Sequence, residues 1–143
     1  MKKGFFIGVL VLIYTVSMAQ KDSIPSIDTV NMARIYVIRA TGYAGSAVNF
    51  RVLVDDVSYC KVKNNRYAVL YVQPGAHMFN ATSWDKPRSE EKFALKLTVE
   101  AGKTYYMNMR IRPRVATTEF YLDEITYNTA APLLEKYKQD ECD

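Results

Sequence analysis

The chain has 143 residues and a formal net charge of +4, with 19 Lys and Arg side chains against 15 Asp and Glu. That length fits one domain of ordinary size, and the nearly balanced charge does not favour nucleic acid, which usually binds a strongly basic domain with clustered Lys and Arg. A single histidine and two distant cysteines cannot supply a zinc spacing motif, and no loop has the alternating acidic ligands of a calcium loop. We therefore expect no metal, no cofactor and no nucleic acid partner.

Residues 1–19 have the pattern of a signal peptide. Residues 2–3 are lysines, residues 5–16 are uncharged and mostly apolar, and residues 17–19 form a small-x-small cleavage site before Gln20. A membrane-spanning helix needs about 20 apolar residues, and polar sequence begins at Gln20. We expect export by this signal to the periplasm or the cell exterior, and no stable membrane span in the mature chain. Loss of the two lysines leaves it a formal charge of +2.

The mature chain starts with a segment that has no sustained period and then becomes strand-like. Residues 20–32 contain Ser, Pro and Asp and predict a flexible leader. Residues 33–39 are rich in β-branched and aromatic side chains and predict a first strand. Residues 48–54 predict a second strand whose buried face carries Val48, Phe50, Val52 and Val54. We expect one domain over residues 33–138 and a tail over residues 139–143.

A conspicuous turn divides residues 67–82. Before it, turn residues at positions 55–56 and 63–66 flank a short strand that contains Cys60. Pro74 and Gly75 suit the second and third positions of a type II turn, and β-prone runs lie on both sides. We predict a hairpin in which Val72 lies opposite His77 and Leu70 lies opposite Phe79. The only histidine then sits at the turn end of an apolar face.

Two strands of clear period follow the polar loop 83–91. Residues 93–99 and 105–111 each alternate apolar and polar side chains, and an Ala-Gly turn at 101–102 separates them, so we expect these two strands to pair. Residues 117–122 can form a last strand. Near the end, Thr129 can cap a short helix that has Pro132 in its first turn. Seven to eight short strands without βαβ spacing predict an all-β antiparallel β-sandwich, Ig-like or prealbumin-like, with a short C-terminal helix.

Five short motifs resemble an uncharacterised family, a domain of unknown function in exported bacterial envelope proteins. The motifs are ARIYVIR (33–39), VDD (54–56), KNNRY (63–67), PGAH (74–77) and AGKTYY (101–106). The Pro-Gly-x-His hairpin is similar to that of PEGA-type surface modules. The resemblance implies a small envelope β-sandwich without catalytic residues. Asp56 departs from the glycine common in such turns, and no lipid-attachment cysteine precedes Cys60, so we expect a member without a lipid anchor.

The outward face of the two periodic strands is the candidate binding surface. It carries basic side chains and Tyr106, with Trp84 in the loop beside it, and exposed aromatics and clustered positive charge suit an envelope protein or an acidic glycan. The candidate residues are Trp84, Lys92, Lys96, Tyr106, Arg110 and Arg112. The alternative is that the charges only keep a sheet face soluble and that Trp84 anchors its own loop.

His77 is the candidate for chemistry, because histidine titrates near neutrality. A hydrolase-type enzyme could use His77 with Cys60 or a nearby carboxylate, whereas the alternative is a structural histidine at the rim of the core. Cys60 and Cys142 could form a disulfide in an oxidising compartment, or Cys60 could be a buried strand residue and Cys142 a free thiol. We favour an exported non-enzymatic module with a binding or structural role in a bacterial envelope.

Overall fold

The computed structural model describes residues 29–43, 45–83, 91–113, 115 and 118–142. The predicted signal peptide and most of the predicted leader therefore lie outside the described residues, as does Trp84. The elements are β1 (Ala33–Arg39), β2 (Phe50–Val54), β3 (Val57–Val62), β4 (Arg66–Val72), β5 (Gly75–Ser83), β6 (Leu95–Val99), β7 (Thr104–Pro113), β8 (Thr118–Ile125), α1 (Tyr127–Lys136) and β9 (Lys138–Gln139), with short 3-10 turns at Thr29–Asn31 and Glu91–Phe93.

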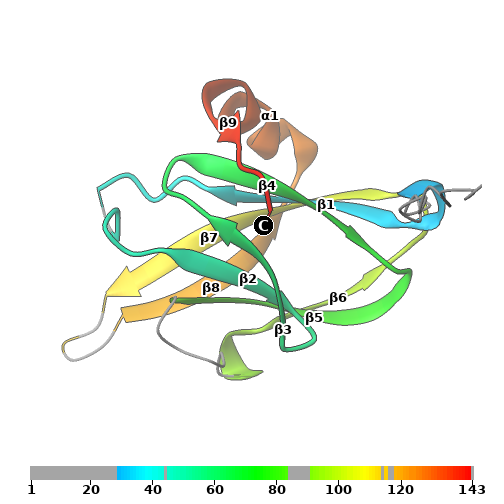
Figure 1. The fold of residues 1–143 in the computed structure, drawn as a ribbon, viewed down its shortest axis with the longest axis horizontal. Coiled ribbons are helices and arrows are strands. Elements are labelled where there is room, and N and C mark those ends of the chain that lie inside the picture. Colours follow the sequence, from blue (N-terminus) through cyan, green and yellow to red (C-terminus); the bar gives the residue numbers. More distant parts are fainter. Residues whose placement is uncertain (1–28, 44, 84–90, 114, 116–117, 143) are drawn as a thin grey trace, which may run out of the picture.

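These strands form two sheets that pack face to face (Figure 1). One sheet has five strands in the order β8-β7-β1-β4-β9, and the other has four in the order β3-β2-β5-β6. The predicted all-β sandwich with a short C-terminal helix is confirmed. The described residues form nine strands rather than seven or eight, and the ninth, β9, is only two residues long.

Two strand pairs are parallel, whereas we expected antiparallel pairing throughout. β1 runs parallel to β7, and β4 runs parallel to β9. Between β1 and β7 the chain forms β4 and all four strands of the smaller sheet. It then returns to the larger sheet, where β7 lies beside β1 on the side away from β4. A parallel neighbour needs such a long crossover, which here passes through the opposite sheet.

The core lies between the sheets and takes alternate side chains from the strands. Its largest apolar members include Phe50 and Phe79 from the smaller sheet and Met107 and Met109 from the larger one, each no more than 2% exposed. The alternation that the sequence predicted for residues 105–111 is therefore correct. Val48, by contrast, is 37% exposed, because β2 begins only at Phe50.

The predicted central hairpin is wrong. β4 and β5 belong to different sheets: Leu70 is paired with Ile35 of β1, and Phe79 with Val54 of β2. The turn before β5 carries the chain from one sheet to the other, and Gly75 there has a φ of 143°, a region that other residues rarely adopt. An apolar alternation fits either two paired strands or two strands that face each other across a core, so the sequence pattern could not distinguish them.

The C-terminal helix starts earlier than predicted. α1 has Thr126 at its N-cap, which makes Thr129 the third helical residue and moves Pro132 beyond the first turn. The hydroxyl groups of Thr126 and Thr129 lie 3.1 Å apart. The helix contacts the outer side of β1 and β7, where Ala130 and Ile38 are fully buried.

One end of the sandwich is built around a buried arginine. Arg39 is the last residue of β1 and is 0% exposed. Its guanidinium donates hydrogen bonds to the carbonyl oxygens of Val62 at 2.7 Å, Gly45 at 2.7 Å and Val48 at 2.8 Å, and it lies 4.3 Å from the ring centre of Phe50. Burial lowers the pKa of Arg39 to about 10, against the opposing attraction of Asp140.

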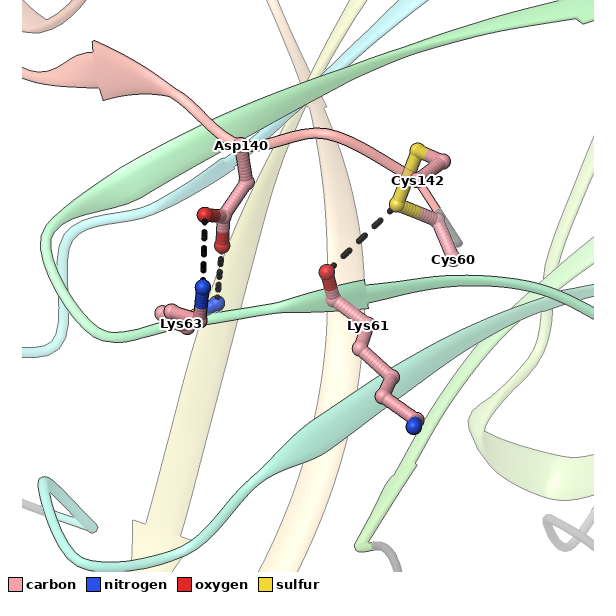
Figure 2. The surroundings of a disulfide bond; sticks show 5 residues. All are labelled: Cys60, Lys61, Lys63, Asp140 and Cys142. Atoms are coloured by element: carbon pink, nitrogen blue, oxygen red, sulfur yellow. Dashed lines mark hydrogen bonds and ion pairs between the residues drawn. A yellow bond between two sulfur atoms is a disulfide. The ribbon is translucent and has the colours of Figure 1, made fainter.

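The last residues of the described chain form a strap across β3 and β4 (Figure 2). Cys142 forms a disulfide with Cys60 of β3. Asp140 is 6% exposed; its carboxylate accepts a hydrogen bond from the Lys63 backbone N–H at 2.7 Å, and its own N–H donates to the carbonyl of Tyr67 at 2.7 Å. We predicted a tail over residues 139–143, but its described part, residues 139–142, is attached to both sheets.

Replacing Arg39 should strongly destabilise the fold. We expect Arg39→Ala to lower the free energy of unfolding by about 3 kcal/mol, because three carbonyl groups lose a charged donor and the vacated site is buried. Urea denaturation followed by circular dichroism measures this. Arg112→Ala, at an exposed position of β7, is the control and should cost about 0.5 kcal/mol or less. Equal effects of the two substitutions would contradict the structural role of Arg39.

The disulfide should stabilise the fold through the unfolded state. It joins residues 82 positions apart, and closing so long a loop contributes up to about 4 to 5 kcal/mol in the chain-entropy model. We expect the Cys60→Ala/Cys142→Ala double variant to unfold at lower urea concentration than the oxidised wild type. The Lys63 amide should also exchange hydrogen faster, because the strap that protects it is released. Wild-type protein in dithiothreitol should match the variant, and no change on reduction would refute the prediction.

Candidate functional site

The predicted basic patch does not form as expected. β6 pairs with β5, and β7 pairs with β1 and β8, so the strands of Lys96 and Arg110 lie in opposite sheets. The Ala-Gly turn at 101–102 connects the sheets and does not close a hairpin. The prediction failed for the same reason as the central hairpin, because two strands with complementary apolar faces can pack across the core without sharing hydrogen bonds.

The individual charges each contact a nearby side chain, on the adjacent strand β8 for Arg110 and Arg112 and in the same 3-10 turn for Lys92. Arg110 forms an ion pair with Asp123 of β8 at 3.1 Å, and the guanidinium of Arg112 lies 5.2 Å from the ring centre of Tyr121. Lys92 lies 4.7 Å from the ring centre of Phe93. Lys92 and Arg112 do approach one pocket of about 280 Å³, but Glu119 and Asp123 line the same pocket, so its charge is mixed.

Tyr106 belongs to a group of tyrosines that the sequence did not identify. Its ring stacks on that of Tyr36 with centres 5.3 Å apart and an interplanar angle of 23°. On one side the ring centre of Tyr67 lies 6.0 Å from that of Tyr36, and on the other side the ring centre of Tyr127 of α1 lies 5.6 Å from that of Tyr106. With Tyr71, four positions along β4 from Tyr67, these residues form what we call the tyrosine face, on the outer side of the five-stranded sheet.

Strand register creates the tyrosine face. Tyr36 is directly opposite Tyr106 in the parallel β1–β7 pair. On the other side of β1, Tyr67 is opposite Ile38 and Tyr71 is opposite Arg34, so these two tyrosines lie on either side of the Tyr36 position. All four strand tyrosines are partly exposed, and Tyr127 is 61% exposed. The outward position of each could have been read from the alternation, but their adjacency depends on the pairing of β1 with β7.

A cation and a small pocket border this face. The guanidinium of Arg34 lies 5.7 Å from the ring centre of Tyr71. Both residues line a pocket of about 220 Å³ together with Thr29 and Thr104. Burial, with smaller contributions from Tyr36 and Tyr127, raises the pKa of Tyr106, while Arg34 opposes that shift. The Tyr106 phenol therefore remains a neutral hydrogen-bond donor at neutral pH.

His77 lies in β5 of the four-stranded sheet, where both of its ring nitrogens contact groups of the protein itself. Its Nδ1 lies 2.6 Å from the Asp55 carboxylate, and its Nε2 lies 2.8 Å from the carbonyl oxygen of Gln73. Because both partners are acceptors, both contacts are hydrogen bonds only when both ring nitrogens carry a proton. The Asp55 carboxylate also accepts from the Met78 N–H at 2.9 Å. His77 thus joins the β2–β3 turn to the segment that enters β5.

Asp55 and Asp56 form the turn that positions this contact. Both have positive φ, 52° and 64°, as a two-residue type I′ hairpin loop requires, and aspartate tolerates that conformation. The hydrogen bond from His77, followed by that from the Met78 amide, lowers the pKa of Asp55. The carboxylate is therefore held ionised.

Cys60, the other candidate for chemistry, also has a structural role. Cys60 is bonded to Cys142, and it is 2% exposed. The nitrogen of His77 that would act as a base in a triad, Nε2, already faces the Gln73 carbonyl. Among the residues that the structure describes, no three His, Cys, Asp or Glu side chains gather in a group that could hold a metal ion.

The fold and this surface define a β-sandwich domain with an aromatic outer face. Residues 29–120, more than half of the chain, match the family described as a protein of unknown function (DUF2846), and the chain belongs to this family. That range includes the four strand tyrosines, whereas Tyr127 and Cys142 lie beyond it. The search of curated proteins found no match. None of the helices in the described ranges is long and apolar enough to cross a membrane.

The His77–Asp55 contact should make stability depend on acid pH. Because the folded-state pKa of Asp55 is lowered, its stabilising contribution is present above the unfolded pKa near 4 and is lost as the pH falls through the folded pKa. We expect wild type to melt at a higher temperature than Asp55→Asn at pH 7, and the difference to vanish near pH 2. Asparagine also tolerates positive φ, so the turn is preserved. A melting-temperature difference that stays constant with pH would rule out this contribution.

Proposed function

We propose that the mature chain is an exported, non-enzymatic module of a bacterial envelope that binds a protein partner through the tyrosine face. The single observation that carries the proposal is the row Tyr67–Tyr36–Tyr106–Tyr127, which places partly exposed aromatic rings side by side on the outer face of a sheet. Tyrosine and arginine are the residues that most often dominate protein interfaces, since they combine large apolar area with hydrogen bonding at little entropic cost.

The ring geometry favours a protein over a glycan. A sugar stacks on the free face of an aromatic ring, but Tyr36 and Tyr106 direct their faces toward each other. Such rings offer edges and hydroxyl groups, which suit the backbone and apolar side chains of a protein. Arg34 at the border adds a positive charge that suits a partner carboxylate. The basic residues of β7 support a glycan less well, since Arg110 is paired with Asp123.

Export and an envelope location rest on the sequence. The charged start, the apolar stretch of residues 5–16 and the cleavage site support a signal peptide, and the resemblance to exported bacterial domains supports an envelope role. A disulfide between Cys60 and Cys142 agrees with an oxidising compartment. A non-enzymatic role is supported by His77, whose two ring nitrogens both contact structural acceptors.

The test is capture from an envelope extract by immobilised mature protein, residues 20–143. A protein that binds the tyrosine face should bind Tyr127→Ala and Arg34→Gln at least about tenfold more weakly than wild type, because each removes an exposed contact at the edge of the row. Tyr43→Ala removes a fully exposed tyrosine in the loop between β1 and β2, outside the row, and serves as the matched control. Capture that survives both test substitutions overturns the proposal, and binding only to an acidic glycan array overturns the choice of a protein partner.

A further inference from the structure

The edge of β4 is largely uncovered in the part of the chain that the structure describes. β4 pairs with β1 along its full length on one side, but on the other side β9 pairs only with Arg66 and Tyr67. No described strand pairs with the next five residues, 68–72, on that side. Their outward backbone groups are therefore available to another strand.

This edge lacks the features that usually prevent strands of different molecules from pairing. Residues 68–72 read AVLYV, with no charge, no proline and no glycine. The β1–β4 register runs without interruption from Ala33–Val72 to Arg39–Arg66, so no bulge twists the edge away. Natural proteins protect exposed edges with such devices, and an apolar edge without them pairs readily with another strand.

The C-terminal strap does not extend along this edge. After Gln139, Asp140 turns toward Lys63, and Cys142 bonds to Cys60 on β3 (Figure 2). The disulfide therefore fixes the end of the strap on the opposite sheet. β9 shows that the edge accepts a strand, and β9 occupies only the part of it at Arg66 and Tyr67.

We propose that a second copy of this chain occupies the edge, with the two β4 strands antiparallel about a two-fold axis at Leu70. In this register Leu70 meets its own copy, the small Ala68 meets Val72, and Val69 meets Tyr71 of the second molecule. Each pair suits its position: a β-branched residue opposite an aromatic one is a favourable cross-strand pair, and no like charges meet. The two five-stranded sheets join into one continuous sheet, which is the isologous contact of a closed dimer.

Exposed apolar side chains on the neighbouring edge agree with this arrangement. β3 is the edge strand of the other sheet and continues directly into β4, so both edges lie on one side of the sandwich. On β3, Val57 is 60% exposed and Tyr59 is 41% exposed. Burial of these side chains against a second molecule would remove apolar surface from water in addition to the strand pairing.

The first test is the mass of the purified mature protein by light scattering over a range of concentrations. The dimer mass is expected for wild type, and at least a tenfold weaker association for Val69→Lys, because two lysines then enter the contact. Val115→Lys places the same charge at a fully exposed position and should leave the dimer intact; circular dichroism confirms that both variants fold. A wild-type monomer at all concentrations overturns the proposal, as does equal association of the two variants.

The second test fixes the register. A mixture of the single variants Val69→Cys and Tyr71→Cys, oxidised with glutathione disulfide, should give a cross-linked heterodimer, because these positions are opposite each other across the axis. The mixture of Val115→Cys and Tyr71→Cys is the control and should not cross-link. Equal cross-linking of both mixtures overturns the β4 register. These measurements need no envelope ligand, so a monomer that captures a protein refutes only the dimer, and a dimer that captures none refutes only the proposed function.

Discussion

The buried guanidinium of Arg39 is the constraint on which one end of the sandwich depends. A positive charge without water is costly, and here the cost is offset by three backbone carbonyl groups and by the ring of Phe50. Two of those carbonyls belong to the loop between β1 and β2, and the third belongs to the end of β3. One side chain at the end of the central strand thus fixes the connection between the two sheets.

The C-terminal strap and Arg39 both stabilise the same end of the sandwich. Asp140 lies close enough to Arg39 to oppose the lowering of its pKa, while its carboxylate accepts from the backbone of Lys63. The Cys60–Cys142 disulfide then holds the end of the strap on β3. This end of the molecule is therefore fixed by charge, hydrogen bonds and a covalent bond. Two strands of the tyrosine face reach this end, because Arg39 is the last residue of β1 and the carbonyl of Tyr67 in β4 accepts a hydrogen bond from the Asp140 N–H.

The two candidates for chemistry, His77 and Cys60, both have structural partners. His77 joins two turns through Asp55 and Gln73, and Cys60 is part of the disulfide. Tyr106 is partly exposed, as the alternation of β7 predicts, but its ring neighbours are Tyr36 and Tyr127, and the basic residues lie farther along β7 or in the other sheet. Aromatic packing rather than positive charge distinguishes this surface.

The sequence by itself determined the all-β class, the positions of most strands, the inward and outward side chains of β7, and the tight turn at Asp55. These features depend on local alternation and on turn chemistry, which neighbouring residues encode. Only the tertiary structure decided which strands share hydrogen bonds. Leu70 could face Phe79 across a hairpin or across a core with the same pattern of apolar residues, and the parallel pairing of Tyr36 with Tyr106 joins segments 70 positions apart. The tyrosine face, and the edge of β4 that no described strand covers beyond Tyr67, follow from that choice of partners, because packing of the two sheets, and not local propensity, selects it.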